Sequence, residues 1–547
     1  MVKEVLQKLK KFFWFLPGFL LWAAYPPMGE KVDVLFALVP LMWLSRKGDV
    51  KKSAKCWFQS GMFFWVATLS WMPAIVKNGG PWPLVVLGWF GLAAYCSLYF
   101  AAYGYLSAAV WKWAREDVGG AETPRANYWR RLVAVFFAEP VLWCGLELVR
   151  SRFGGGFAWN QLGVVPANGG FASPAAIGGI YLLSAVVILI NGMLAGVVER
   201  VWNASKSPFR NLRVYGSLET VITTVMVLMV YFLPGAFNGH DVERESLKVA
   251  LIQRNFPCCF AKDRGNENPW QVYQRLLANP AYLKPDLVIL PESAMSEFGP
   301  VDSQRAYSFA DWVFDLTGAS LLAGGSRREE KREYNSAALY CSTNNTVNAQ
   351  IYDKVHLVPF GEFIPGDKVI TILQKLAPVG SCTPGELKTL TLPLDGREVE
   401  MGVAICFEDT DSAQLRRLAE MGAKVLVLIT NDSWFSNSHE AEQHSWQAVA
   451  RAVETALPIV RVGNSGVSGV ISPDGKATWL VDENGRELVD KEAAMCERVE
   501  IAKSAPRRTV YVRLGDKPLA VLFSLLLITM ILVKYRNEYE KRRYLSM

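Results

Sequence analysis

Residues 401–409 read MGVAICFED, so an apolar strand runs directly into Cys406, which Phe407 and two acidic residues follow. A strand that ends in a turn exposes the side chain at its tip and aims the next backbone amide toward it. Alone, a cysteine after an apolar strand is most often a core residue. Two other strand ends in the same part of the chain change that interpretation.

The first is at residues 286–293, DLVILPES, where Glu292 follows a buried strand. Open α/β folds place their sites at such strand ends, and a partly desolvated glutamate there can abstract a proton. The second is at residues 352–365, YDKVHLVPFGEFIP, where Lys354 could lower the pKa of a thiol and stabilise an oxyanion. His356 could be a base, although its apolar neighbours favour a packed structural histidine. Together with the cysteine, these residues predict one convergent site.

Short strands alternate with helical stretches throughout residues 247–500. Continuous β-branched runs such as VLVLI at 425–429 indicate strands buried on both faces. The expected strands are 247–253, 286–290, 320–323, 336–340, 398–405, 424–430, 459–462 and 469–472. The expected helices are 270–278, 303–315, 411–421 and 440–455. This pattern predicts a layered α/β sandwich.

The rest of the chain is much more apolar. Hydrophobic residues make up 51% of the 547 residues, and most long apolar runs lie before residue 235. We expect an α-helical membrane bundle of about eight spans, at 12–25, 34–44, 57–72, 83–111, 132–148, 177–198, 221–233 and 518–533. The first two runs are short, and form either a tight hairpin of spans or one re-entrant element. The last run rises only about 24 Å, so Lys517 and Lys534 would have to extend to the surface.

Lysine and arginine residues set the expected orientation, because loops retained in the cytoplasm collect them. They are dense around residues 3–11, 46–55, 112–131, 200–213 and 534–543, and sparse in the intervening short loops. With eight spans, both termini are cytoplasmic and the α/β segment lies outside. The expected parts are therefore a transmembrane helical domain at 1–237 with about seven spans, an outer catalytic domain at 238–512, and a C-terminal transmembrane helix with a cytoplasmic tail at 513–547.

The net charge of +7 follows from this topology, so a nucleic-acid-binding function loses its main support. The nine cysteines contain no Cys-x-x-Cys pair, and we expect neither a metal site nor a cofactor. Six of the cysteines lie in the outer segment, where disulfides are permitted, and their pairing stays open. If Cys406 is a nucleophile, it must remain free.

Pro291-Glu292, Asp353-Lys354 and the stretch ICFE at 405–408 resemble the Glu-Lys-Cys triad of the nitrilase superfamily. Joined to membrane spans, the triad resembles the apolipoprotein N-acyltransferase family of Gram-negative inner membranes, over essentially the whole chain. The helical half adds LSW at 69–71 before NGG at 78–80, Glu147 with Arg150, and GFAWNQLG at 156–163. The resemblance implies a nitrilase-like α-β-β-α sandwich attached to the membrane bundle.

The resemblance also implies that Cys406 takes an acyl chain from a phospholipid as a thioester, with Glu292 as general base and then general acid. Lys354 and the amide of Phe407, where the family usually has tyrosine, would stabilise the oxyanion. The acceptor would be the α-amine of the N-terminal diacylglyceryl-cysteine of an apolipoprotein. The implied location is the inner membrane, with the catalytic domain in the periplasm, and we expect a monomer.

Further residues match the family around the triad. Glu362 and Glu408 align with carboxylates that orient the lysine and the attacking amine, although each could be an ordinary surface acid. Trp434, in TNDSWF at 430–435, would line the acyl or peptide side, with packing as its rival role. Trp159, in GFAWNQLG, is a further candidate for substrate binding.

Two other functions fit parts of the sequence. A membrane-tethered nitrilase-like amidase would deliver its acyl group to water and release free fatty acid. A transporter or receptor whose outer domain only binds a ligand would tolerate Cys406→Ala. It would also carry polar residues buried within its spans, for which Glu139 and Glu147 are the candidates.

Overall fold

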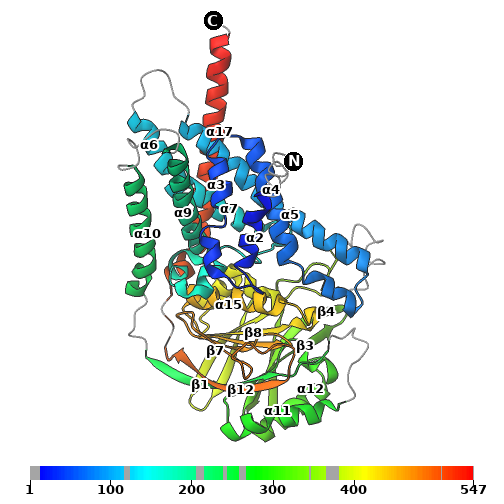
Figure 1. Cartoon of the computed structure of the whole chain (residues 1–547). Helices are drawn as coiled ribbons and strands as arrows, with labels where there is room; N and C mark the ends of the chain where they lie inside the picture. The colour runs from blue at the N-terminus through cyan, green and yellow to red at the C-terminus, as the bar shows by residue number, and fades with distance from the viewer. Residues whose placement is uncertain are drawn as a thin grey trace.

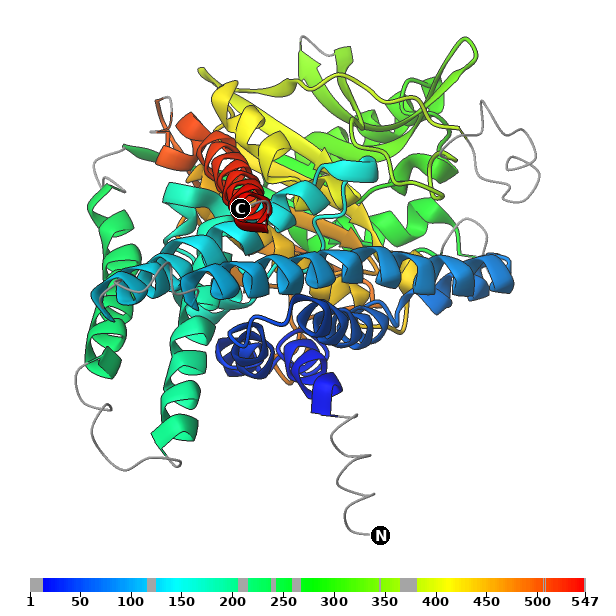
Figure 2. The ribbon, with the colours of Figure 1, turned by 90° about the horizontal axis from the view of Figure 1, so that it is seen from above.

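The computed structural model describes residues 13–545, apart from residues 116–123, 205–214, 238–242, 258–266, 344–345, 365–380, 505 and 507. A helical half lies above an α/β half (Figure 1). The last helix, α17 (Lys517–Leu545), returns to the helical half and runs away from the sheets. Seen from above, α5 (Trp82–Arg115) crosses most of the width of the molecule (Figure 2).

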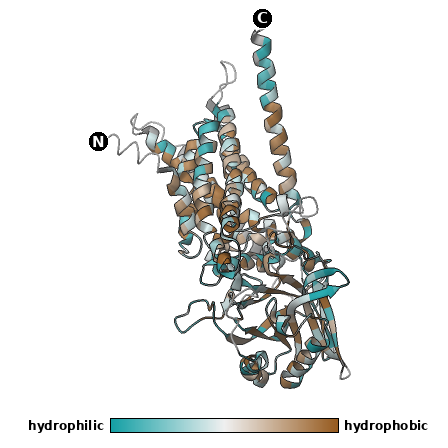
Figure 3. Ribbon diagram, turned by 90° about the vertical axis from the view of Figure 1, so that its right-hand side faces the viewer, coloured by the Kyte–Doolittle hydropathy of each residue, from teal (hydrophilic) through white to brown (hydrophobic). Residues whose placement is uncertain are grey.

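The helical half combines long apolar helices with short connecting elements. The long helices, besides α5 and α17, are α4 (Val50–Thr68), α7 (Glu139–Arg150), α9 (Ala175–Ala204) and α10 (Tyr215–Phe237). The short elements are η1 (Phe13–Phe15), α2 (Leu16–Ala23), η2 (Lys31–Leu35), α3 (Val39–Ser45), η3 (Met72–Asn78), α6 (Pro124–Val133), the π-helical turn η4 (Ala134–Ala138), η5 (Phe153–Gly155), α8 (Val164–Pro166) and η6 (Ala167–Phe171). The hydropathy colouring shows the apolar residues concentrated in the long helices (Figure 3).

Within the described residues, four helical stretches are long and apolar enough to cross a membrane: Trp82–Arg115, Tyr128–Arg150, Ala175–Trp202 and Lys517–Glu540. The expected count of eight is therefore not confirmed. The expected spans at 12–25 and 34–44 hold only the eight-residue α2 and the seven-residue α3. Each rises about 12 Å or less, well short of a hydrocarbon core of about 30 Å. Pro26 and Pro27 end the first helix, because proline removes a backbone donor.

This short helical pair nevertheless runs alongside α9. At its bend, Lys31 Nζ donates to the carbonyl of Asn168 at 2.8 Å. At its other end, Arg46 Nη2 donates to the carbonyl of Gly192 at 2.7 Å, in the middle of α9, and Arg46 Nη1 lies 3.5 Å from Glu199 Oε2, nearer the end of that helix. The pair is therefore packed inside the helical half rather than lying on its surface.

The buried carboxylates of α7 both have partners. Glu139 accepts from Ser107 Oγ at 3.0 Å and from Trp111 Nε1 at 2.9 Å. Glu147 accepts from the backbone amide of Leu162 at 2.9 Å. These hydrogen bonds connect α7 to α5 and to the loop before α8. They give both acids a packing role.

Two six-stranded sheets form the α/β half. The first has the order β12-β1-β2-β3-β4-β5 and the second β11-β10-β9-β8-β7-β6. Strands β1, β2 and β3 are parallel to one another, as are β7, β8 and β9, and the other neighbours are antiparallel. The strand bounds are β1 (Arg244–Gln253), β2 (Leu287–Ile289), β3 (Ser320–Glu329), β4 (Arg332–Thr343), β5 (Thr346–Asp353), β6 (Thr389–Leu394), β7 (Arg397–Ile405), β8 (Val425–Asn431), β9 (Ile459–Asn464), β10 (Gly469–Ile471), β11 (Ala477–Trp479) and β12 (Ala493–Ala502).

The sheets stack face to face and carry helices on their outer faces. One apolar core lies between the sheets and contains residues of β1 to β4 and β6 to β9. A second core packs the first sheet against α11 (Pro269–Leu283) and α12 (Gln304–Thr317), and a third packs the second sheet against α14 (Ser412–Glu420) and α15 (Glu440–Thr455). The remaining elements are η7 (Ala294–Glu297), η8 (Cys406–Thr410), η9 (Asp432–Phe435) and α16 (Val510–Leu514). The expected α/β sandwich is thus present.

Helix α15 joins the two halves. Its buried Gln443 donates to the carbonyls of Pro26 at 2.9 Å and Thr68 at 3.3 Å, and accepts from Trp159 Nε1 at 3.0 Å. Further along the same helix, Glu454 accepts from the amide of Ile180 at 2.7 Å, where α9 is interrupted at Gly179 (φ +64°). These contacts fix the α/β half against four segments of the helical half.

Close packing of α4 against α5 gives a test of this arrangement. A Cβ atom on Gly104 would lie 2.3 Å from the buried Trp57 ring, whereas one on Gly88 of the same helix would meet nothing within 4 Å. We expect Gly104→Leu to lower the free energy of unfolding by about 1–3 kcal/mol through overpacking. Thermal unfolding in detergent measures the change. Gly88→Leu is the control and should leave Tm unchanged or raise it; equal Tm values for the two variants would contradict this packing.

Candidate active site

Three strand ends bring Glu292, Lys354 and Cys406 together. Cys406 follows β7 at an elbow where its φ is +55°, a backbone conformation that residues other than glycine rarely adopt. Glu292 follows β2 in the other sheet and accepts from the amide of Asn431, at the end of β8, at 2.8 Å. Lys354 follows β5, and its Nζ lies 3.9 Å from Glu292 Oε1. The site therefore bridges the two sheets.

Burial and nearby charges set the protonation of these groups. Burial raises the pKa of Cys406 well above its usual value, Glu292 raises it further, and Lys354 lowers it by less. The thiol is therefore protonated at rest, and the expected lowering by Lys354 is outweighed. Burial also raises the pKa of Glu292, against the opposing effect of Lys354. A carboxylate with a raised pKa is a stronger base for the thiol proton.

Lys354 remains charged despite its burial. Desolvation lowers the pKa of this amine, but Glu362, Cys406 and Glu292 together raise it above its usual value. Glu362 Oε2 lies 3.0 Å from Nζ, and the lysine side chain is only 1% exposed. A fixed, desolvated ammonium is a strong stabiliser of a developing oxyanion.

Asn335, in the middle of β4, is a site residue that the sequence analysis missed. Its Nδ2 donates to Glu292 Oε1 and to Glu362 Oε1, both at 2.6 Å. One amide group therefore holds both carboxylates at the lysine. A single asparagine inside a strand carries no motif, so no sequence signal marked it.

Glu408 connects two of the strand ends. Its carboxylate is fully buried and accepts from the amides of Ile405 at 2.8 Å, Val355 at 2.7 Å and His356 at 3.0 Å. The elbow of the cysteine and the strand end of the lysine thus share one anchor. Glu362 accepts from the amide of Val358 at 2.8 Å as well as contacting Lys354. The surface-acid alternative is wrong for both residues.

Aromatic residues of the helical half cover the residue after the cysteine. The Phe407 ring stacks with Trp159 at 6.3 Å between centroids and 9° between planes, and with Phe157 at 6.0 Å and 16°. The carbonyl of Trp434 in η9 accepts from Asn78 Nδ2 at 2.8 Å. Both segments therefore place the site against the helical half. The expected substrate contact of Trp434 stays a prediction.

His356 lies at the edge of this cluster. Its Nε2 is 2.8 Å from the carbonyl of Gly155, and its Nδ1 is 3.9 Å from Asp411 Oδ2. Both ring nitrogens thus point to partners outside the Glu292, Lys354 and Cys406 group. This placement favours the structural interpretation over a role as the base.

Comparison with known proteins agrees with this geometry. Residues 17–193 match the apolipoprotein N-acyltransferase N-terminal domain, and residues 248–495 match the carbon-nitrogen hydrolase domain. Over almost its whole length the chain is similar to apolipoprotein N-acyltransferases. Its α/β half is thus a nitrilase-like carbon-nitrogen hydrolase domain with two sheets.

Relatives in this family match along almost their full length. The apolipoprotein N-acyltransferase of Geobacter metallireducens is 28% identical over 92% of this chain and 91% of its own. That of Shewanella oneidensis is 25% identical over 95% and 93%. A solved amidase of the nitrilase superfamily from Nesterenkonia is 17% identical over 51% of this chain and 98% of its own, with a TM-score of 0.36.

One group of buried side chains in the α/β half has the composition of a metal site. Ligand atoms of Asp432, Glu440 and His444 lie within 4.8 Å of one another. Both nitrogens of His444 already face carboxylates, and Arg461 Nη2 lies 3.5 Å from Asp432 Oδ2. A guanidinium there would repel a cation, so these donors fit an internal ion-pair network.

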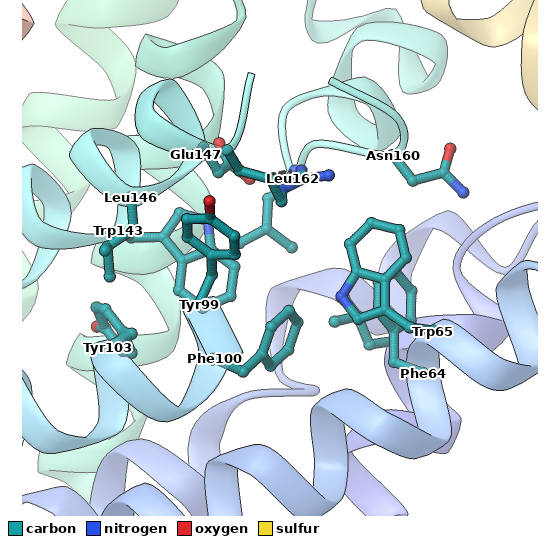
Figure 4. Close-up of a pocket in the computed structure, with 12 residues that line it drawn as sticks. Phe64, Trp65, Tyr99, Phe100, Tyr103, Trp143, Leu146, Glu147, Asn160 and Leu162 are labelled. Carbon is teal, nitrogen blue, oxygen red and sulfur yellow. Dashed lines mark hydrogen bonds between the residues drawn. The ribbon is translucent and has the colours of Figure 1, made fainter. Parts of the chain in front are cut away.

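Figure 4 shows a pocket inside the helical half. Aromatic side chains of α4, α5 and α7 line it, among them Trp65, Tyr99 and Trp143. Glu147 and Arg150 lie at its polar side, and Arg150 donates to the carbonyl of Trp159 at 2.9 Å. The pocket therefore adjoins the loop that covers Phe407.

Asn335 gives a test of the site. Because its hydrogen bond lowers the pKa of Glu292, we expect Asn335→Leu to raise that pKa and move the acidic limb of the pH–rate profile upward. The shift should be about half a unit to one unit, since one unit corresponds to about 1.4 kcal/mol. The measurement is the pH dependence of acyl-enzyme formation. Asn484→Leu, at an exposed turn, is the control, and an unshifted limb in Asn335→Leu would refute the assignment.

Proposed function

We propose that this chain transfers an acyl chain from a phospholipid to the N-terminal α-amine of the diacylglyceryl-cysteine of apolipoproteins, through a thioester on Cys406. The observation that carries the proposal is a protonated thiol placed beside a basic carboxylate and a buried ammonium, in a chain that is similar to this family. This reaction completes the maturation of a lipoprotein and leaves a lysophospholipid.

The first half-reaction forms the thioester. Glu292 takes the proton of Cys406, and the thiolate attacks the ester carbonyl of the phospholipid. Lys354 and the amide of Phe407 stabilise the oxyanion. The carbon–oxygen ester bond then breaks, and Glu292 returns the proton to the departing lysophospholipid hydroxyl.

The second half-reaction uses the same groups. The α-amine of the apolipoprotein attacks the thioester carbonyl, and Glu292 accepts a proton from the amine. The carbon–sulfur bond breaks, and the proton passes to the thiolate of Cys406. The product is an amide, and the thiol is restored. Glu362 holds Lys354 during both half-reactions, and Trp159 and Trp434 line the substrate-binding side of the site.

We further propose a multi-pass protein of the inner membrane with about eight crossings. Its parts are a helical domain at 1–237, a periplasmic catalytic domain at 238–512, and a helix with a cytoplasmic tail at 513–547. The contacts of Arg46 with Gly192 and Glu199 support counting the short pair as two broken crossings, because they reach the second half of α9. Irregular backbone at that depth is tolerated where protein buries it.

A labelled phospholipid tests the thioester. The purified protein, incubated with phospholipid that carries a labelled acyl chain, should form a covalent adduct that hydroxylamine removes. Cys406→Ser should form no such adduct. Cys382→Ser is the matched control, since Cys382 is also partly buried in the same domain, and it should keep the adduct. An equal adduct in Cys406→Ser would overturn the mechanism.

The acceptor separates acyl transfer from hydrolysis. A diacylglyceryl-cysteine peptide with a free α-amine should discharge the adduct and become acylated, whereas its N-acetylated form should not. Release of labelled fatty acid, with no acylated peptide, would establish the amidase alternative instead.

Reporter fusions test the orientation. A green fluorescent protein fused after residue 547 should fluoresce, because the tail is expected in the cytoplasm. Alkaline phosphatase fused at the same residue should be inactive, and the same enzyme inserted at the exposed turn around Asn484 should be active. The reverse activities would contradict the orientation.

A further inference from the structure

A second cluster of buried charges lies beside Cys406. His444 of α15 stands between two carboxylates, with Nε2 3.1 Å from Asp409 Oδ1 and Nδ1 3.0 Å from Asp432 Oδ1. Arg461 of β9 contacts the same two acids, at 2.6 Å from Asp409 Oδ2 and 3.5 Å from Asp432 Oδ2. Glu440 lies 3.6 Å from His444 Nδ1. All five residues are at most 4% exposed.

The charges of this cluster balance. Burial lowers the pKa of His444, but Asp409 and Asp432 raise it by more, to about 10, so the ring is an imidazolium. Burial and Asp432 raise the pKa of Glu440 well above its usual value, which favours the neutral form of this carboxyl. Two cations therefore face two carboxylates. Buried ionic groups are tolerated when they are paired in this way.

Asp432 connects the cluster to the nucleophile. Strands β7 and β8 pair in parallel with Ile405 opposite Ile429, so the next residues, Cys406 and Thr430, are neighbours. Thr430 Oγ1 donates to Asp432 Oδ1 at 2.8 Å. The charge of Asp432 raises the pKa of the thiol. Whatever holds Asp432 thus affects how easily the thiolate forms.

The cluster also touches the helical half. The Trp159 ring, which stacks on Phe407, lies 5.4 Å from the His444 ring at a tilt of 41°. Gln443, the residue before His444, accepts from Trp159 Nε1 at 3.0 Å. Trp159 of the helical half therefore contacts both the residue after the nucleophile and the histidine of the cluster.

We propose that His444 is a positioning residue for thioester formation: its imidazolium neutralises and orients the Asp432 carboxylate, whose charge acts on the Cys406 sulfur. The role rests on the proposed function, but its physical effect falls on the thiol itself. Without His444, one carboxylate charge beside Cys406 is left unbalanced, and the thiolate becomes harder to form.

Alkylation of Cys406 by iodoacetamide, followed against pH in the full-length protein in detergent, tests this role without any phospholipid. We expect His444→Gln to raise the pH midpoint of alkylation by about one unit, equivalent to a tenfold slower reaction below the midpoint. His439→Gln is the matched control, because His439 immediately precedes the same helix and lies outside the charge cluster; its midpoint should not change. An unchanged midpoint in His444→Gln overturns the proposal.

Two further variants separate positioning from a general loss of structure. In His444→Lys the ammonium keeps a positive charge facing Asp432, so we expect part of the shift to be rescued. In Asp432→Asn the carboxylate charge is gone, so adding His444→Gln should not raise the midpoint further. Equal shifts in His444→Lys and His444→Gln, or additive shifts in the double variant, would overturn the proposal.

The outcome is distinguishable from failure of the proposed function. If the wild-type protein forms no acyl adduct while His444→Gln shifts the alkylation midpoint, the acyl transfer is wrong and the coupling to the thiol stands. If the adduct forms and the midpoint does not move, the acyl transfer stands and the role of His444 falls.

Discussion

The buried polar contact between α15 and the helical half is the constraint on which the rest of the structure depends. Gln443 is completely buried, and both the oxygen and the nitrogen of its amide form hydrogen bonds with groups of the helical half. Leaving such a group unpaired costs about 1–3 kcal/mol, so the contact tolerates only one relative placement of the two halves. An apolar interface of the same area would slide more easily, because apolar contacts have no direction.

This placement decides the environment of the nucleophile. Because Trp159 approaches from the helical half, Phe407 and the elbow of Cys406 are only partly exposed. Desolvation raises the pKa of both the thiol and Glu292. The thiol therefore keeps its proton at rest, and the Glu292 carboxylate is a stronger base for removing it. Lys354 stays charged because the carboxylates of Glu362, Glu292 and Glu408 surround it. The same burial thus produces a neutral nucleophile, a strong base and a fixed cation.

Burial on both faces explains which elements the sequence predicts. All eight expected strands are present, and the runs that indicated them, such as VLVLI at 425–429, belong to interior strands. The strands missed are β5, β6, β11 and β12, which are the four sheet edges. An edge strand has one open side and fewer buried neighbours, so polar residues interrupt its apolar pattern, as in AAMCERVEIA of β12. Composition likewise overestimates the length of the first two helices, because α2 has only eight residues and α3 only seven.

The same reasoning separates the site residues that sequence can predict from those it cannot. Glu292, Lys354 and Cys406 each follow an apolar strand, so position and residue type together mark them. Asn335 lies within a strand, and His444 within a helix, and each matters because of what folding brings next to it from distant segments. Chemistry of this kind depends on buried pairing across elements. The sequence alone gives little sign of such residues. Once α15 is known to lie between the two halves, its polar residues, almost all of which are buried, become the candidates for this role.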